Sequence, residues 1–341
     1  MVIDVHVHCR DWNWKHKETV AHALSVAEKA GLSAIFDMPN TDPLVLTKAD
    51  VEKRLELVPK DAKVWYGVYV GVTTDLNQVR RAADLVGTIE NVVGLKMFAG
   101  KSVGNLTVAR EIDQISIYNT LAECGYLGVL TVHCEKESLL GPWDPKNPIS
   151  HATTGRPPIS EIASVEDQIK FAIDNDYKGV LNIAHASCPE TVELVKKHKD
   201  VLKITCEATP HHLFLNQNYM DTPNGLRFKM NPPLRYVDDV SKLMKYLQEG
   251  YITMLGTDHA PHTLEEKIQK YMSGIPGLHI WPKFLQVLKN YISDEMLQKI
   301  SHQNAIDTFK LKVKLPEREP TGEDLSKEYE SIDAWASTSV F

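Results

Sequence analysis

The chain has 341 residues, a length that a (β/α)8 barrel with insertions accommodates as one domain. Its hydrophobic content of 43% and charged content of 24% are ordinary for a globular protein and exclude a largely disordered chain. The net charge of -7 and the scattered lysines and arginines exclude a basic surface for nucleic acid.

From the amino terminus, short apolar runs rich in β-branched residues alternate with longer stretches of helical period. Eight runs are predicted strands: 2–7, 33–38, 63–70, 92–98, 128–133, 179–185, 202–207 and 252–258. Helices are predicted at 18–30, 48–57, 109–123, 161–175, 189–198 and 237–249. This alternation is typical of parallel βα units. The predicted fold is α/β, a single (β/α)8 TIM barrel over residues 1–311, with a tail, residues 312–341, packing on it.

Three long stretches rich in Pro, Gly, Asn or Thr interrupt the alternation, at 136–158, 211–235 and 260–282. Each follows a predicted strand, and in a barrel the loops after the strands build the mouth of the active site. We therefore expect functional loops there, and a lid in the glycine-containing segment 99–105.

The opening segment and the cysteines both indicate the cytoplasm. The opening MVIDVHVHCR lacks the apolar core of a signal peptide, and no later stretch is long enough to span a membrane. The cysteines stand singly, without a C-x-x-C pair, at Cys9, Cys124, Cys134, Cys188 and Cys206. We expect free, mostly buried thiols and no disulfide framework or cysteine zinc cage.

The first predicted strand carries a pattern suited to a metal ion. Strand alternation predicts Asp4, His6 and His8 on one face, with Val5 and Val7 on the other. Inward-facing barrel positions favour branched apolar residues, so we interpret the two histidines as ligands.

Four more polar residues fall near the carboxyl ends of predicted strands: Lys96, His133, His185 and Asp258. Burying such a residue in an apolar strand is costly unless it is paired or bound to metal. Together with the two histidines of the first strand they are expected to converge on one rim of the barrel, and four imidazoles with a carboxylate suit zinc.

Lys96 leaves two alternatives open, because a protonated amine repels a cation. A lysine carbamylated by carbon dioxide presents two oxygens that are able to bridge two metals. Alternatively, an unmodified Lys96 pairs with Asp258 in a site that holds one metal.

Five motifs carry a resemblance to a known family: Asp4-Val5-His6-Val7-His8-Cys9-Arg10, Asp37-Met38-Pro39-Asn40-Thr41, Gly94-Leu95-Lys96, Glu207-Ala208-Thr209-Pro210-His211-His212-Leu213 and Gly256-Thr257-Asp258-His259-Ala260-Pro261-His262. In these motifs and their order the chain resembles the dihydroorotases of the amidohydrolase superfamily. The resemblance is strongest to the type I branch, which includes the dihydroorotase domain of the animal multifunctional pyrimidine enzyme. The match extends from about residue 2 to about residue 310.

The resemblance implies a site with two zinc ions. His6, His8 and Asp258 are implied ligands of the first ion, His133 and His185 of the second, and a carbamylated Lys96 bridges them. Asp258 is also implied as the general acid–base. The implied reaction is the reversible cyclisation of N-carbamoyl-L-aspartate to L-dihydroorotate, with loss of water, in pyrimidine synthesis.

The resemblance also implies residues that bind the substrate. Arg10, Asn40 and His262 match positions that contact the substrate carboxylate, and Asn231 matches a contact to its ring. Many relatives carry an amino-terminal segment that joins the carboxyl terminus in a small β-sandwich. Here the barrel begins almost at Met1, so no such sandwich is expected.

Four neighbouring polar residues are not counted among the predicted ligands, although Glu207 is left open as an additional one. We interpret His211 and His212 as structural, Glu207 as a partner of a ligand, and His259 as pointing away from the metal because strand neighbours alternate.

Two other functions remain open. A hydantoinase, dihydropyrimidinase or allantoinase shares the barrel and the metals, although Arg10 favours a substrate with a free carboxylate. A catalytically inactive homologue that serves as a scaffold is the alternative of a different class. As partners, a homodimer and an association with other enzymes of pyrimidine synthesis are left open.

Overall fold

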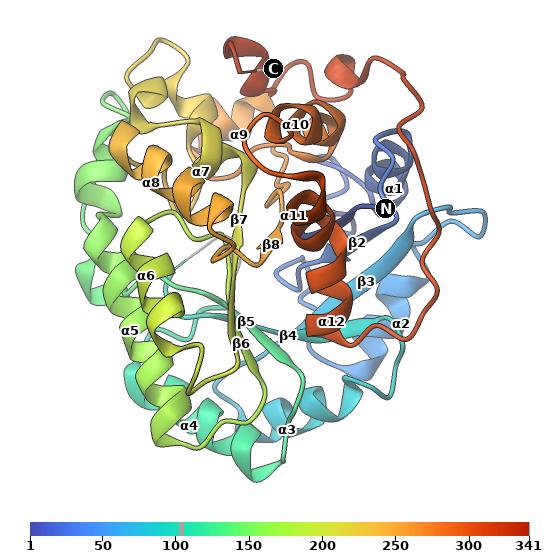
Figure 1. The fold of residues 1–341 in the computed structure, drawn as a ribbon, viewed down its shortest axis with the longest axis vertical. Coiled ribbons are helices and arrows are strands. Elements are labelled where there is room, and N and C mark those ends of the chain that lie inside the picture. Colours follow the sequence, from blue (N-terminus) through green and yellow to red (C-terminus); the bar gives the residue numbers. More distant parts are fainter. Residues whose placement is uncertain (102–105, 341) are drawn as a thin grey trace.

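The computed structural model describes residues 1–101 and 106–340, and its centre is one parallel sheet whose eight strands follow sequence order (Figure 1). The strands are β1 (Ile3–Val7), β2 (Ala34–Asp37), β3 (Trp65–Gly71), β4 (Val92–Phe98), β5 (Val129–His133), β6 (Val180–Ile183), β7 (Ile204–Ala208) and β8 (Met254–Leu255). Val7 forms a parallel bridge with His259, which lies beyond β8, so the sheet closes on itself. The predicted (β/α)8 barrel is confirmed, and the described residues form no second sheet.

Helices surround the strands (Figure 1). Those that follow β1 to β7 are α1 (Val20–Lys29), α2 (Lys48–Leu55), α3 (Leu76–Leu85), α4 (Glu111–Glu123), α5 (Pro158–Asp174), α6 (Pro189–His198), α7 (Pro210–Phe214) and α8 (Val237–Gln248). Beyond β8 lie α9 (Leu264–Ile268), α10 (Trp281–Leu288), α11 (Asp294–Gln298) and α12 (Asn304–Phe309). Thr19, Thr47 and Asp75 begin the first three helices, each accepting a hydrogen bond from a backbone N–H of the first turn.

Two of the predicted strands end two or more residues earlier in the structure than in the sequence analysis. The predicted strand 252–258 is reduced to β8, and the predicted strand 179–185 ends with β6. The cause is the backbone beyond each strand, because Asp258 and His185 have positive φ values of 48° and 36°. Non-glycine residues rarely adopt this region, and residues held there are often functional.

The core has two parts that are separated by the strands. Inside the barrel, Phe36 and Tyr69 pack against Phe309 of α12 with ring centroids 5.1 and 6.0 Å from it, in a cluster that also contains the first residues of several strands. Outside it, residues such as Leu95 and Val132 pack in the layer between sheet and helices. Apolar packing therefore fills one end of the barrel, and polar side chains are left to the carboxyl ends of the strands.

The carboxyl-terminal segment runs back along α1. Arg318 pairs with Glu28 at 2.9 Å, Glu328 pairs with Lys29 at 2.9 Å, and the Tyr329 hydroxyl donates to Glu18 at 2.5 Å. In Figure 1 this segment is the red chain that passes from α12 to the far end of the barrel.

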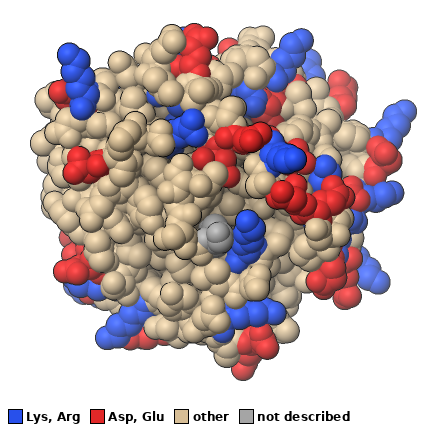
Figure 2. All heavy atoms as spheres, turned by 90° about the horizontal axis from the view of Figure 1, so that it is seen from above, with Lys and Arg blue, Asp and Glu red and all other residues tan. Residues whose placement is uncertain are grey.

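Charges of both signs are interspersed on the face seen in Figure 2, and the coloured atoms show no broad basic area there. Among residues 1–101 and 106–340, no helix has the length and apolar composition needed to cross a bilayer. Of the five free cysteines, Cys124 is exposed and the other four are buried.

A buried ion pair anchors the loop that follows β1. Arg54 contacts Asp37 Oδ2 through Nε and Nη2 at 2.9 and 2.7 Å, and its Nη1 donates to the Arg10 carbonyl at 2.9 Å. We expect Arg54→Met to lower the free energy of unfolding by about 3–5 kcal/mol, because it leaves the Asp37 carboxylate buried without its cation. Urea denaturation measures the change. The control is Arg80→Met, which breaks the exposed pair with Glu123 and costs about 1 kcal/mol or less. Equal losses in the two variants would contradict the expectation.

Candidate active site

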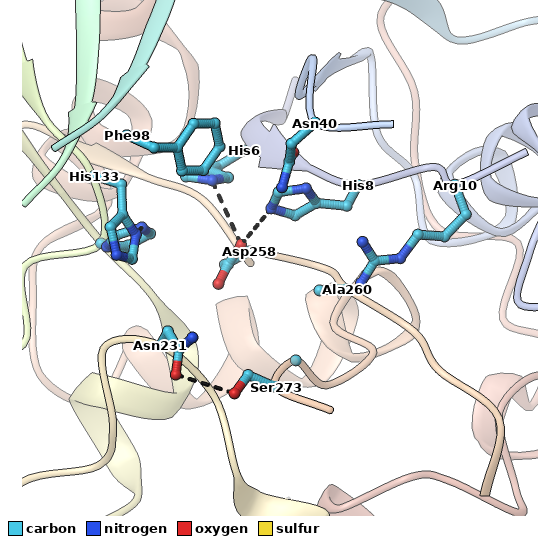
Figure 3. Close-up of a pocket in the computed structure, with 12 residues that line it drawn as sticks. His6, His8, Arg10, Asn40, Phe98, His133, Asn231, Asp258, Ala260 and Ser273 are labelled. Carbon is cyan, nitrogen blue, oxygen red and sulfur yellow. Dashed lines mark hydrogen bonds and ion pairs between the residues drawn. The ribbon is translucent and has the colours of Figure 1, made fainter. Parts of the chain in front are cut away.

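A cavity opens at the carboxyl ends of the strands, and most of the predicted site residues line it (Figure 3). Its lining includes His6, His8, Arg10, Asn40, Phe98, His133, His185, Asn231, Asp258 and Ser273. These residues come from different strand ends and from loops far apart in sequence, as in other barrel enzymes.

His6, His8 and Asp258 form a compact group suited to a cation. Asp258 Oδ1 lies 2.9 Å from His8 Nε2 and 3.4 Å from His6 Nε2. One ligand atom from each residue lies within 4.8 Å of the others. Burial alone raises the pKa of Asp258, but the hydrogen bond with His8 and the nearby His6 outweigh burial and hold this pKa well below its usual range. Asp258 is therefore an anion facing two imidazoles.

The ring of His6 is oriented from behind by Glu207 of β7. His6 Nδ1 lies 2.8 Å from Glu207 Oε2, and Asn182 donates to the other carboxylate oxygen at 2.5 Å. A proton on Nδ1 leaves the lone pair of Nε2 on the side of Asp258, as a metal-binding histidine requires. Burial raises the pKa of Glu207 to about 7. The structure thus places Glu207 behind a ligand candidate, as expected.

His133 and His185 form a second group on the same wall. His133 Nδ1 lies 3.0 Å from His185 Nε2, and the rings of His6 and His185 are 5.1 Å apart. Burial lowers the pKa of His185 well below its ordinary value, which favours the neutral imidazole that binds metal. Glu135 Oε2 lies 2.8 Å from His133 Nε2 and orients this ring as Glu207 orients His6.

Lys96 of β4 is fully buried near both groups, because its charge acts on His6 and His8 of the first group and on His185 of the second. Its Nζ has no hydrogen-bond partner among the described residues, and the Phe98 ring lies 5.1 Å away. Burial lowers the pKa of Lys96 to about 8, toward the neutral amine. A salt bridge with Asp258, the alternative left open by the sequence, is absent from the described contacts.

The prediction that Asp4 shares a face with His6 and His8 is wrong. The pairing of β1 with β2 shifts register between Asp4 and Val7, so the alternation is interrupted. The Asp4 carboxylate instead accepts hydrogen bonds from Thr257 Oγ1 and from Trp281 Nε1 of α10, at 2.5 and 2.8 Å.

Three of the four predicted substrate contacts line the cavity, and the fourth lies behind one of them. Arg10, Asn40 and Asn231 line the cavity, and Figure 3 shows the Arg10 guanidinium pointing into it. His262 lies behind Arg10, with its Nε2 3.1 Å from Arg10 Nη2 and 3.0 Å from the Ser273 carbonyl. In this structure His262 therefore contacts the guanidinium, and a direct substrate contact stays a prediction.

The three histidines that the sequence analysis set aside lie outside the group of ligand candidates. His212 bonds Thr209 Oγ1 and the Pro232 carbonyl at 2.9 and 3.1 Å. His211 is buried beside it, with ring centroids 4.4 Å apart. His259 points away from the cavity and bonds Glu18 at 2.7 Å.

The sequence analysis missed several residues of this site. Glu135, two residues after His133, carried a detectable signal, because acidic residues often follow metal-binding histidines to orient them. His151 and Ser273 lie in two of the long loops and contact Asn231, and nothing in their spacing indicated that contact. Of the expected lid, residues 102–105 lie outside the described residues.

Comparison with known proteins finds relatives that match most of the chain. No protein-family model matches the chain. The chain is 31% identical to the dihydroorotase of Methanosphaera stadtmanae over 326 residues, which cover 91% of this chain and 70% of that protein. It is 30% identical to the dihydroorotase of Fusobacterium nucleatum over 321 residues, which cover 91% and 72%.

Solved structures share the fold. The L-hydantoinase (dihydropyrimidinase) from Arthrobacter aurescens superposes with a TM-score of 0.79 at 23% identity, covering 95% of this chain and 74% of that one. The dihydroorotase from Campylobacter jejuni gives 0.70 at 20% identity, covering 92% and 84%.

The barrel and the polar cluster at its mouth define a hydrolase of the amidohydrolase superfamily. Within that superfamily, the chain belongs to the dihydroorotase family.

Proposed function

We propose that this protein is a dihydroorotase that interconverts N-carbamoyl-L-aspartate and L-dihydroorotate. One observation favours it over a hydantoinase-type activity: the buried Arg10 guanidinium points into the cavity that holds the His and Asp cluster. A substrate with a free carboxylate matches this cation, whereas an uncharged ring leaves it unpaired in a buried site.

We further propose that the enzyme works with two zinc ions. The first ion would be held by His6, His8 and Asp258, and the second by His133 and His185. A carbamylated Lys96 would hold both ions. The fit is supported by the unpartnered buried nitrogens of Lys96 and His185, within the described residues, and by the carboxylates that orient two of the imidazoles. When bound, zinc polarises a carbonyl and lowers the pKa of water.

The residues of the chain have separate tasks in ring opening. Arg10 binds the substrate carboxylate, Asn40 lies beside it in the cavity wall, and Asn231 contacts the ring. The oxygen of water forms a bond with the ring carbonyl carbon while the carbon–nitrogen bond breaks. Asp258 takes the proton from the water and delivers it to the departing nitrogen, and the reverse sequence closes the ring with release of water.

Turnover of four cyclic substrates and of carbamoyl aspartate by the purified protein tests the proposal. We expect dihydroorotate to be preferred over hydantoin, dihydrouracil and allantoin, and carbamoyl aspartate to be cyclised. A preference for one of the other three rings overturns it. Zinc analysis of the same sample separates an enzyme from a scaffold, because a metal-free, inactive chain that still binds a partner favours the scaffold.

Replacing Arg10 with Met is expected to raise KM for dihydroorotate about 10- to 100-fold, which corresponds to the loss of a charge-assisted hydrogen bond of about 1.5–3 kcal/mol. Zinc content should be unchanged, because the Arg10 guanidinium contacts the Pro261 carbonyl and His262, neither of which is a ligand candidate. Steady-state kinetics and metal analysis are the measurements. Arg10→Lys keeps the positive charge but loses the paired N–H donors of the guanidinium. Its KM should lie between those of the parent protein and Arg10→Met. Loss of zinc with unchanged KM would contradict the assignment.

The proposal also covers the cellular compartment and the oligomeric state of the enzyme. We place it in the cytoplasm and leave a homodimer and contacts with other pyrimidine enzymes as candidate assemblies, which sedimentation of the purified protein distinguishes from a monomer.

A further inference from the structure

The side chain of Asn231 is held by donors from two of the long loops. His151 Nε2 lies 3.0 Å from Asn231 Oδ1 and 3.1 Å from the Met230 carbonyl. Ser273 Oγ lies 3.0 Å from the same Oδ1, and this contact is drawn in Figure 3. His151 and Ser273 are 2% and 7% exposed, so water does not readily replace either contact.

The chemistry of the neighbours fixes which atoms donate. The Met230 carbonyl only accepts, so Nε2 of His151 must carry a proton. Lys229 Nζ lies 2.5 Å from Ser273 Oγ. The Lys229 amine is the donor in this contact, so it occupies the acceptor side of the hydroxyl. The single hydroxyl proton of Ser273 is then directed to Asn231.

With two donors aimed at one atom of the Asn231 amide, that atom must be its oxygen. The amide nitrogen then lies on the cavity side, as Figure 3 shows. We propose that Ser273 and His151 are positioning residues that fix Asn231 as a hydrogen-bond donor, so the site selects a ring with a carbonyl oxygen at this wall. The inference rests on the proposed function, in which the ring of dihydroorotate supplies that oxygen.

The three long loops pack against one another around Asn231. Trp143, from the loop 136–158, lies 5.2 Å from the His151 ring and 4.9 Å from Lys229 Nζ. Lys267 holds the backbone on both sides by donating to the carbonyls of Lys229 and Gly274 at 2.8 Å. All three loops therefore meet at Asn231, and none contributes a predicted metal ligand there.

The test is Ser273→Ala, measured by steady-state kinetics with dihydroorotate. We expect KM to rise about fivefold to tenfold, the value of one hydrogen bond, with kcat changed less than KM and zinc content unchanged. Ser273→Thr keeps the hydroxyl and should restore KM. Ser138→Ala, at an exposed position after β5, is the control and should match the parent protein.

A double-mutant cycle distinguishes positioning from a general structural role. If Ser273 acts through Asn231, then Ser273→Ala adds no further change to KM in an Asn231→Ala background. Additive effects, or an unchanged KM in the single variant, overturn the inference. If the parent protein does not turn over dihydroorotate, the proposed function fails. Crystal structures of the parent and Ser273→Ala proteins then test the positioning itself, and one shared Asn231 rotamer in both overturns it.

Discussion

Replacing Asp258 with Asn should lower kcat for dihydroorotate by about 10²–10⁴-fold, the usual contribution of a general acid–base. The amide cannot take the proton from water and pass it to the ring nitrogen. Asn is also the substitution that least disturbs the backbone, because it tolerates the positive φ of 48° at this position. The measurements are single-turnover kinetics and zinc analysis, and we expect part of the zinc to be retained.

The matched control is Asp333→Asn, which changes a buried aspartate that pairs with His279 outside this cavity. It should leave kcat within a few-fold of the parent value. Comparable activity of the Asp258→Asn and parent proteins would remove Asp258 from the proton-transfer role, whatever its part in holding metal.

Replacing Lys96 with Ala should reduce zinc from two ions to one or fewer per chain and remove most of the activity. If the Lys96 amine is carbamylated, it forms a carbon–nitrogen bond with carbon dioxide and releases a proton, and the resulting anion is able to hold two cations. A small carboxylic acid added to the variant should then restore part of both zinc and turnover. Zinc stoichiometry with and without added acetate is the measurement.

The parent protein gives the corresponding control. Zinc and carbon dioxide should bind cooperatively, so reconstitution in buffer freed of carbon dioxide should yield fewer bound ions. One zinc per chain, no dependence on carbon dioxide and electron density that ends at a bare Lys96 nitrogen would refute the bridge.

The barrel was predictable because its signal is repeated along the chain. Most βα units carry a β-branched run followed by a helical period. An error of two or three residues at one end, as at 161–175 against Pro158–Asp174, therefore does not change the architecture. The ligand candidates were predictable because polar residues stand out at the ends of apolar strands. A histidine such as His133 at the end of an otherwise apolar strand has few structural explanations.

The contacts that orient the cluster could not be predicted, because they depend on backbone departures and on pairs far apart in sequence. The register shift in β1 directs Asp4 toward α10, against the simple alternation. Glu207 reaches His6 across 201 positions, and only the closed barrel brings them together. The loop 211–235 looked irregular, yet it contains α7 and two short 3-10 helices, because local caps such as Thr209 suffice for single turns.

The parallel bridge between Val7 and His259, which closes the barrel, also determines at what stage of synthesis the cluster can form. His8 is synthesised well before Asp258, which it contacts and which lies 250 positions later in the chain. A growing chain therefore exposes its histidines without the carboxylate, and all three ligands meet only after the last strand docks on the first. If this group holds the proposed metal, its capture would follow synthesis of nearly the whole barrel, because all three side chains are needed for it.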